Sequence, residues 1–163
     1  MQTAAPDTSG TASPRRTIRV LLVPADAAGP VEVVTVADSA RAISDTLGGY
    51  LLDDSTIGSL PPGELFTVYR ADDVSTLADN PRAAALVARL GLVGRRLQAR
   101  LRGPVLVAGL DPTTGGDLDV PVGILTAAQQ VGLRITGPGV PPRRYLPTHE
   151  RSAPTPTTPS TMG

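Results

Sequence analysis

Proline and glycine constrain this chain more than any other feature of its sequence. There are 17 of each among 163 residues, and they divide the apolar residues into short runs bounded by turns. The two ends, residues 1–16 and 137–163, carry no apolar periodicity. We expect both ends to be disordered tails, because such segments bury too little apolar surface to offset the entropy of ordering. The foldable part is then one small domain at residues 17–136.

The residue types that are missing exclude several classes of chemistry. The chain has no Cys and one His, so disulfides, thiolate metal sites and cysteine nucleophiles are impossible. The single histidine, His149, lies in the Pro/Thr-rich C-terminal tail, where no fold would position a partner for a triad or a metal site. We therefore predict no enzyme, no cofactor and no metal. The absence of Cys and of any membrane-length apolar run favours a cytoplasmic protein with no membrane partner.

The apolar runs predict an α+β domain with a mixed or antiparallel sheet. The runs that we expect to form strands lie at residues 17–23, 31–36, 65–70, 105–110 and 133–135. The first two should pair antiparallel, and the uninterrupted apolar run at 105–110 is expected at the centre of the sheet. The last should lie at an edge. A short helix is expected from Asp119 or Pro121 through Val131.

A further helix should follow the second strand. Asp38 or Ser39 can cap its start, because a short polar side chain accepts a hydrogen bond from the first helical turn. Gly48-Gly49 provides the left-handed exit that ends it. Tyr50 comes next, either exposed beside this turn or packed into the core.

The basic residues are all arginine, and they are unevenly distributed. The absence of Lys fits the codon bias of a GC-rich genome, or else selection for bidentate recognition of phosphate or carboxylate. Net charge is zero. Residues 26–79 hold ten acids against two Arg, whereas residues 80–103 hold six Arg and no acid. The sequence therefore predicts a molecule with an acidic pole and a basic pole.

The arginine-rich segment is predicted to be one long helix, residues 80–102, packed on one face of the sheet. Gly91 and Gly94 weaken this helix, so a kink or two abutting helices is the alternative. Asn80-Pro81 is a strong helix start, and Leu recurs at helical spacing behind it. The arginines that fall on one flank of this apolar stripe are Arg82, Arg89, Arg96 and Arg100. That flank could bind nucleic-acid phosphates or an acidic protein surface. It could equally be a solvated face whose arginines pair with the acidic half of the chain.

Carboxylates are the other chemically active groups. The candidates are the pairs Asp53-Asp54 and Asp72-Asp73, and Asp111, Asp117 and Asp119 around a glycine-rich loop. Neighbours in an extended chain point in opposite directions, and the loop lacks the spacing of a calcium helix-loop-helix. Turn and cap duty explains these residues. A small carboxylate-dependent enzyme remains an alternative.

Several segments together carry a resemblance. They are the two strands ending at Val23 and Val36, the turn Leu47-Gly48-Gly49-Tyr50-Leu51, the helix start Asn80-Pro81-Arg82, and the run Gly103-Pro104-Val105-Leu106-Val107-Ala108-Gly109. Over about residues 17 to 125 the chain resembles an uncharacterised family of small bacterial, phage and plasmid proteins known as a domain of unknown function. The resemblance implies an accessory protein of mobile elements that acts by binding, and it supplies no catalytic residue.

The leading hypothesis is therefore a non-enzymatic accessory protein that binds a protein partner or itself. The candidate surface combines Tyr50, beside the structural turn Gly48-Gly49, with Arg82, Arg89, Arg96 and Arg100. The first alternative is a nucleic-acid-binding regulator that uses the arginine-rich helix, and the second is the carboxylate enzyme.

Overall fold

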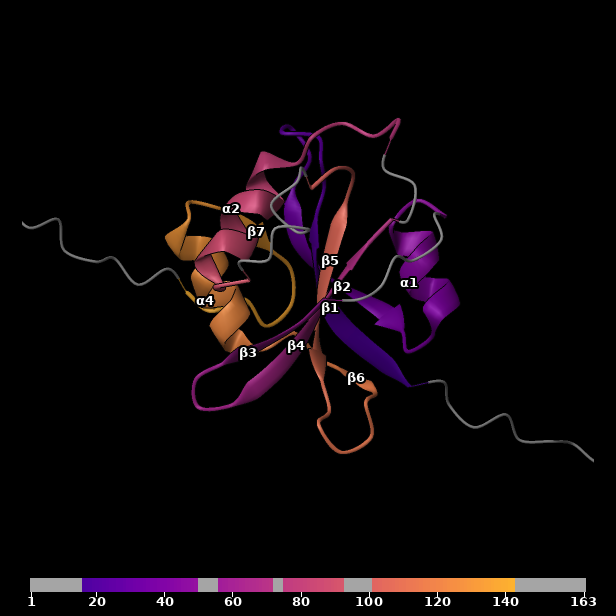
Figure 1. Ribbon diagram of the computed structural model, residues 1–163, viewed down its shortest axis with the longest axis vertical. Helices are drawn as coiled ribbons and strands as arrows, with labels where there is room; N and C mark the ends of the chain where they lie inside the picture. Colours follow the sequence, from indigo (N-terminus) through magenta and orange to yellow (C-terminus); the bar gives the residue numbers. More distant parts are fainter. Residues whose placement is uncertain (1–15, 50–55, 72–74, 93–100, 143–163) are drawn as a thin grey trace, which may run out of the picture.

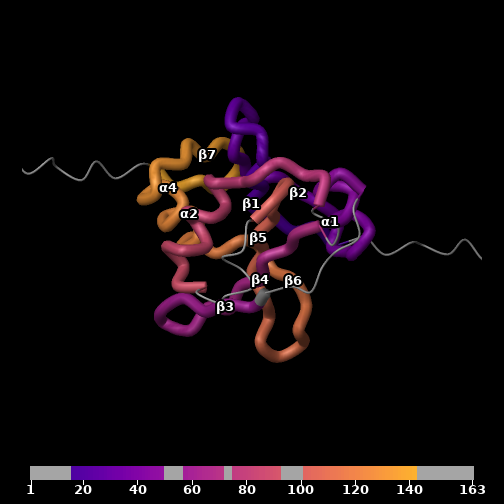
Figure 2. The backbone as a smooth tube through the Cα atoms, turned by 45° about the horizontal axis from the view of Figure 1, so that its top comes forward, coloured from indigo at the N-terminus to yellow at the C-terminus, as the bar shows by residue number. Residues whose placement is uncertain are grey.

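The computed structural model describes residues 16–49, 56–71, 75–92 and 101–142. These residues form a mixed seven-stranded sheet with helices on both faces, so the predicted α+β class is confirmed. In chain order the elements are β1 (Thr17–Val23), β2 (Val31–Ala37), α1 (Ala40–Thr46), β3 (Thr56–Leu60), β4 (Glu64–Arg70), α2 (Pro81–Arg89), β5 (Val105–Leu110), β6 (Asp117–Leu118), α4 (Val122–Gln130) and β7 (Ile135–Thr136). Helices α2 and α4 lie on one side of the sheet and α1 on the other, and the turned view keeps this arrangement (Figures 1 and 2).

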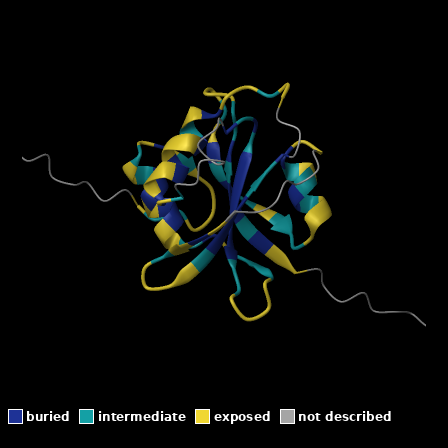
Figure 3. Cartoon of the chain, in the orientation of Figure 1, coloured by how far each residue is buried: buried dark blue, intermediate teal, exposed yellow. Residues whose placement is uncertain are grey.

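The strand order is β3-β4-β5-β1-β2-β7, with β6 paired to the far end of β5. All neighbours are antiparallel except β2 and β7. The predicted hairpin of β1 and β2 is confirmed, as is the central position of β5 between β4 and β1. Strand β5 is buried almost throughout (Figure 3), which explains why its sequence is apolar without alternation.

Alternate residues of the central strands supply two separate cores. Val105 and Val107 face α2 and α4, in a cluster that also holds Phe66. Leu106 and Ala108 face the opposite way and pack with Ile43 and Leu47 of the α1 region. Because successive side chains of a strand point to opposite faces, β5 contributes side chains to both cores.

Helix α1 forms as its sequence predicts. The Ser39 side chain accepts a hydrogen bond from the backbone N–H of Ala42, which satisfies one of the free donors of the first turn. The chain then leaves the helix through Gly48 and Gly49, with φ of 95° and 80°. A side chain is strained in this left-handed region, so the two glycines act as the predicted structural turn.

Helix α2 is shorter than the sequence predicts. It begins at Asn80 and Pro81 as expected, but it ends at Arg89, and Gly91 adopts a φ of 73° just after it. The expectation of one helix over residues 80–102 is wrong. Arg102 instead forms an isolated β-bridge with Asp79, directly before the helix. The left-handed Gly91, one of the two glycines expected to weaken this helix, follows its last residue and ends it.

Other differences lie in the short elements. Strands β3 and β6 were not predicted, because Ser59 and Leu60 were assigned to the turn that continues through Pro61-Pro62-Gly63 and no strand was expected after the glycine-rich loop. Helix α4 occupies the expected place, but Asp119 does not cap it, since the cap position is Pro121 without a side-chain bond. Residues 137–142 were assigned to the tail, yet the Gln129 side chain donates to the Pro141 carbonyl at 2.9 Å. No helix in the described ranges has the length and apolarity that a membrane crossing requires.

Candidate functional site

Arg82, one of the predicted binding residues, is used inside the molecule. Its guanidinium donates to the backbone carbonyls of Gly29 at 2.8 Å and Pro24 at 2.6 Å, and also to that of Asp26. These carbonyls all belong to the connection between β1 and β2. Arg82 therefore ties α2 to this connection, and its partners are carbonyl groups rather than the carboxylates that the sequence pointed to.

Arg89 is exposed but also has a partner. Its Nε and Nη2 atoms donate to the Gln130 side-chain oxygen at 3.1 and 2.7 Å, which links α2 to α4. Tyr50, Arg96 and Arg100 lie outside the described residues. The structure thus brings only Arg82 and Arg89 of the predicted set onto one described helix, and both are engaged within the chain.

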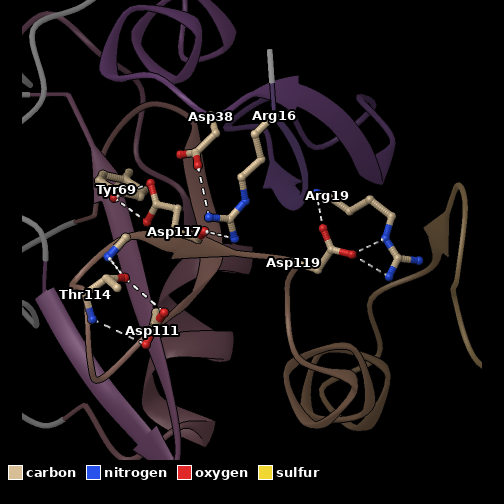
Figure 4. A network of polar contacts seen from close by, with 9 residues as sticks. Arg16, Arg19, Asp38, Tyr69, Asp111, Thr114, Asp117 and Asp119 are labelled. Carbon is tan, nitrogen blue, oxygen red and sulfur yellow. Dashed lines mark hydrogen bonds and ion pairs between the residues drawn. The ribbon is translucent and has the colours of Figure 1, made fainter. Parts of the chain in front are cut away.

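A polar network surrounds Asp117 on β6 (Figure 4). The Tyr69 hydroxyl lies 2.7 and 2.8 Å from the two carboxylate oxygens of Asp117 and donates to them. Arg16 donates to the Asp117 carbonyl at 3.1 Å and forms an ion pair with Asp38 at 3.6 Å. Tyr69 of β4 and Asp117 of β6 thus meet Arg16, which directly precedes β1, and Asp38, which directly follows β2.

Burial raises the pKa values of two groups in this network, Asp117 and Tyr69. It raises the pKa of the Asp117 carboxyl above its usual 3.8, and the nearby charge of Asp38 adds to the rise, while Tyr69 and Arg16 oppose it. Burial and the Asp117 carboxylate also raise the pKa of the Tyr69 hydroxyl. The phenol therefore stays protonated at neutral pH and acts as a hydrogen-bond donor.

The two remaining acids of this region have separate structural roles. Asp119 accepts from the backbone N–H of Arg19 at 2.8 Å and from its Nε at 2.9 Å, so its pKa is lowered. Asp111 accepts from the backbone N–H groups of Thr113 and Thr114, which also lowers its pKa. Asp111 stabilises a turn, as predicted. Asp117 and Asp119 instead bind Tyr69 and Arg19, which are far from them in the sequence.

A hollow of about 270 Å³ lies near this end of the sheet. Its lining includes Glu64, Leu65, Leu118, Asp119 and Pro121, but not Asp117. The Asp117 carboxyl, whose pKa is raised, is therefore not part of the lining of the hollow. Within the residues that can be described, no group of three or more His, Cys, Asp or Glu could hold a metal ion.

Strand β3 offers a different kind of site. It pairs only with β4, so its outer side has no strand partner in the described part of the chain. Its sequence, Thr-Ile-Gly-Ser-Leu, carries no charge, and Ile57 is 57% exposed. Val122, at the start of α4, is 60% exposed. A methyl group added to the neighbouring Gly123 would meet Leu60 of β3 at 2.9 Å, which places the start of α4 beside the face of β3 opposite to Ile57.

No strand was expected at residues 56–60, because Ser59 and Leu60 were assigned to the turn that continues through Pro61-Pro62-Gly63. The available signal was an uncharged run with β-branched Thr56 and Ile57 directly ahead of the Pro61-Pro62-Gly63 turn, a short strand-turn pattern.

Comparisons with known proteins add little. No family model and no curated protein matches this chain. One solved structure, described as the crystal structure of small RNA methyltransferase HEN1, is similar with a TM-score of 0.48 and 16% identity. The match covers 72% of this chain and 16% of that one. This likeness is too distant to bear on the activity of the chain.

Proposed function

We propose that the protein works by binding another protein chain, and that strand β3 is the binding edge. A strand with one unpaired side presents a row of backbone N–H and C=O groups, which an extended segment of a partner can complete. The observation that carries this proposal is an uncharged edge strand with an exposed Ile57.

Strand β3 lacks the features that usually prevent another strand from pairing with a free edge. Soluble proteins usually shield a free edge with charged residues, prolines or bulges inside the strand. Strand β3 contains none of these charges or prolines, and the two prolines that follow it lie in the turn to β4.

The earlier alternatives receive less support from the described residues. A nucleic-acid site on the arginine-rich segment could not use Arg82 freely, because its guanidinium is bound to the β1–β2 connection. The arginines of this segment also do not lie on one continuous helix, because α2 ends at Arg89. A carboxylate enzyme could use Glu64 and Asp119, which line the hollow, but Arg19 already binds Asp119, and Asp117, the carboxyl with the raised pKa, lies outside the hollow. Both remain predictions.

We further propose the setting that the family resemblance implies, a cytoplasmic accessory protein of a plasmid or phage without catalytic activity. Binding through a sheet edge suits this setting, because it requires neither a cofactor nor a reactive side chain.

The test is to select displayed random peptides against the full chain and to map the selected peptides on it by amide chemical shifts. We expect extended peptides that shift the amides of residues 56–60. Replacing Ile57 with Lys should weaken their binding roughly tenfold, because a charge on an edge strand opposes pairing.

The matched control is Ala84→Lys, which places the same charge on an exposed position of α2. Peptide affinity should not change in this variant. Selected peptides that map to another surface, or that bind Ile57→Lys as tightly as the unmodified chain, would contradict the proposal.

A further inference from the structure

We infer that the partner segment at this edge is β3 of a second copy of the chain, paired antiparallel about a twofold axis at Gly58. This inference rests on the proposed function, since it uses the same edge. It adds the identity of the partner, its direction and its register.

The residues of β3 that direct their backbone N–H and C=O groups outward are the ones that this pairing requires. The Leu60 carbonyl accepts from the N–H of Gly63 at 2.6 Å, so Leu60 directs its backbone groups toward the β4 side. Backbone groups alternate sides along a strand. Gly58 therefore also faces β4, whereas Ile57 and Ser59 direct their N–H and C=O groups outward.

The twofold axis at Gly58 makes these outward groups complementary. Ile57 then lies opposite Ser59 of the second copy, and Ser59 lies opposite the second copy's Ile57. Each pair exchanges backbone hydrogen bonds, with its Cα atoms about 5.5 Å apart. Ile57 and Ser59 are both exposed on the same face of the sheet, so each large side chain meets a small one.

Gly58 lies at the centre of the proposed pair of strands. Gly58 has no side chain, and a methyl group added to it would collide with the Phe66 ring and come within 2.8 Å of Leu92. This glycine is therefore required by the packing of β3 over Phe66 and Leu92, on the face opposite to Ile57 and Ser59. The strand carries no charge, so two copies meet without the like-charge repulsion that destabilises directly opposed pairs.

The C-terminal tail of the same chain is a poorer occupant. Its sequence has prolines at positions 147, 154, 156 and 159, and proline has no N–H to donate to a ladder. A second β3 has no proline. Because five paired residues a side bury less than the roughly 1,200 Å² of a stable interface, the dimer should be weak and depend on concentration.

The first measurement is sedimentation velocity of the full chain from about 10 to about 500 µM, a range that suits a weak interface. The unmodified chain and Ala84→Lys should shift from monomer to dimer across this range. Ile57→Lys should lose roughly nine-tenths of the dimer at the highest concentration.

The second measurement uses the absence of cysteine from the chain. Single variants Ile57→Cys and Ser59→Cys are oxidised separately and as a mixture. In the proposed register, the two different positions face each other within disulfide distance. Identical positions are diagonal, at about 7 to 8 Å, beyond the usual reach of a disulfide. We expect mixed disulfides to form roughly tenfold faster than same-variant disulfides.

A monomer at all concentrations, a dimer that persists in Ile57→Lys, or same-variant disulfides that form as fast as mixed ones would each overturn the inference. Peptides that bind β3 in a chain that stays monomeric would leave the proposed function standing without self-pairing. Failure of both experiments would remove the edge as a binding site.

Discussion

Asn80 shows how one side chain connects three segments. It is 1% exposed, its Nδ2 donates to the carbonyls of Val23 and Gly103, and its Oδ1 accepts from the N–H of Ala83. Asn80→Ala should lower the free energy of unfolding by about 3 kcal/mol, because buried backbone groups lose their partners together with the helix cap. Urea denaturation measures this loss.

Asn80→Asp separates the two contributions. The carboxylate keeps the acceptor for the cap but cannot donate to the two carbonyls, so the variant should also be destabilised at neutral pH. If it were as stable as the unmodified protein, the bonds to Val23 and Gly103 would contribute nothing.

Asp117 should give stability a pH dependence of unusual sign. Because its pKa is raised on folding, the folded chain binds more protons than the unfolded chain just above pH 3.8. This carboxyl therefore makes stability fall as pH rises through that window. Asp117→Asn should remove the fall, and urea midpoints measured at steps of pH test it.

Asp119 provides the opposite control. Its pKa is lowered on folding, so its contribution is present above its unfolded pKa and is lost as pH falls through the folded value. Asp119→Asn should abolish that acid-side loss. Equal pH profiles for the two Asn variants would contradict the assignment of the two carboxyls.

At the scale of elements, Arg82 and Arg89 contrast on the same helix. Arg82 is partly buried on three carbonyls, whereas Arg89 is exposed beside Gln130. Arg82→Ser should cost about 2 kcal/mol of unfolding free energy, and Arg89→Ser less than about 0.5 kcal/mol. Thermal unfolding compares the two. Equal losses would show that the β1–β2 connection does not depend on Arg82.

Elements could be predicted where their signals are local. Ser39 and the pair Gly48-Gly49 bound α1 within about ten residues of one another, and each acts through its own backbone conformation. The end of α2 was only partly predictable: Gly91 marks a weak point, but the Leu spacing continues past it, so the sequence does not decide between a kinked helix and one that ends. Strand β3 was missed because five residues carry little periodicity.

At the scale of the molecule, stability should be greatest at the centre of the sheet. Strand β5 has neighbours on both sides and buried residues on both faces. Its amides should exchange with solvent most slowly, whereas those of the two-residue edge strand β7 should exchange early. Hydrogen exchange measured by NMR tests this order, and early exchange within Val105–Ala108 would contradict it.

The same measurement bears on the candidate site. The outward amides of Ile57 and Ser59 should be poorly protected in dilute protein and better protected at high concentration, since pairing with a second copy would bury them. A protection pattern independent of concentration would count against self-association at β3.

The sequence by itself determined the α+β class, the β1–β2 hairpin, the capped helix α1 and the central place of β5. Each depends on contacts between near neighbours or on the period of a single strand. Only the tertiary structure decided the partners of Arg82, Asp117 and Asp119, and the exposure of β3. Those properties depend on residues brought together from distant parts of the chain, and no local pattern of side chains records which ones meet.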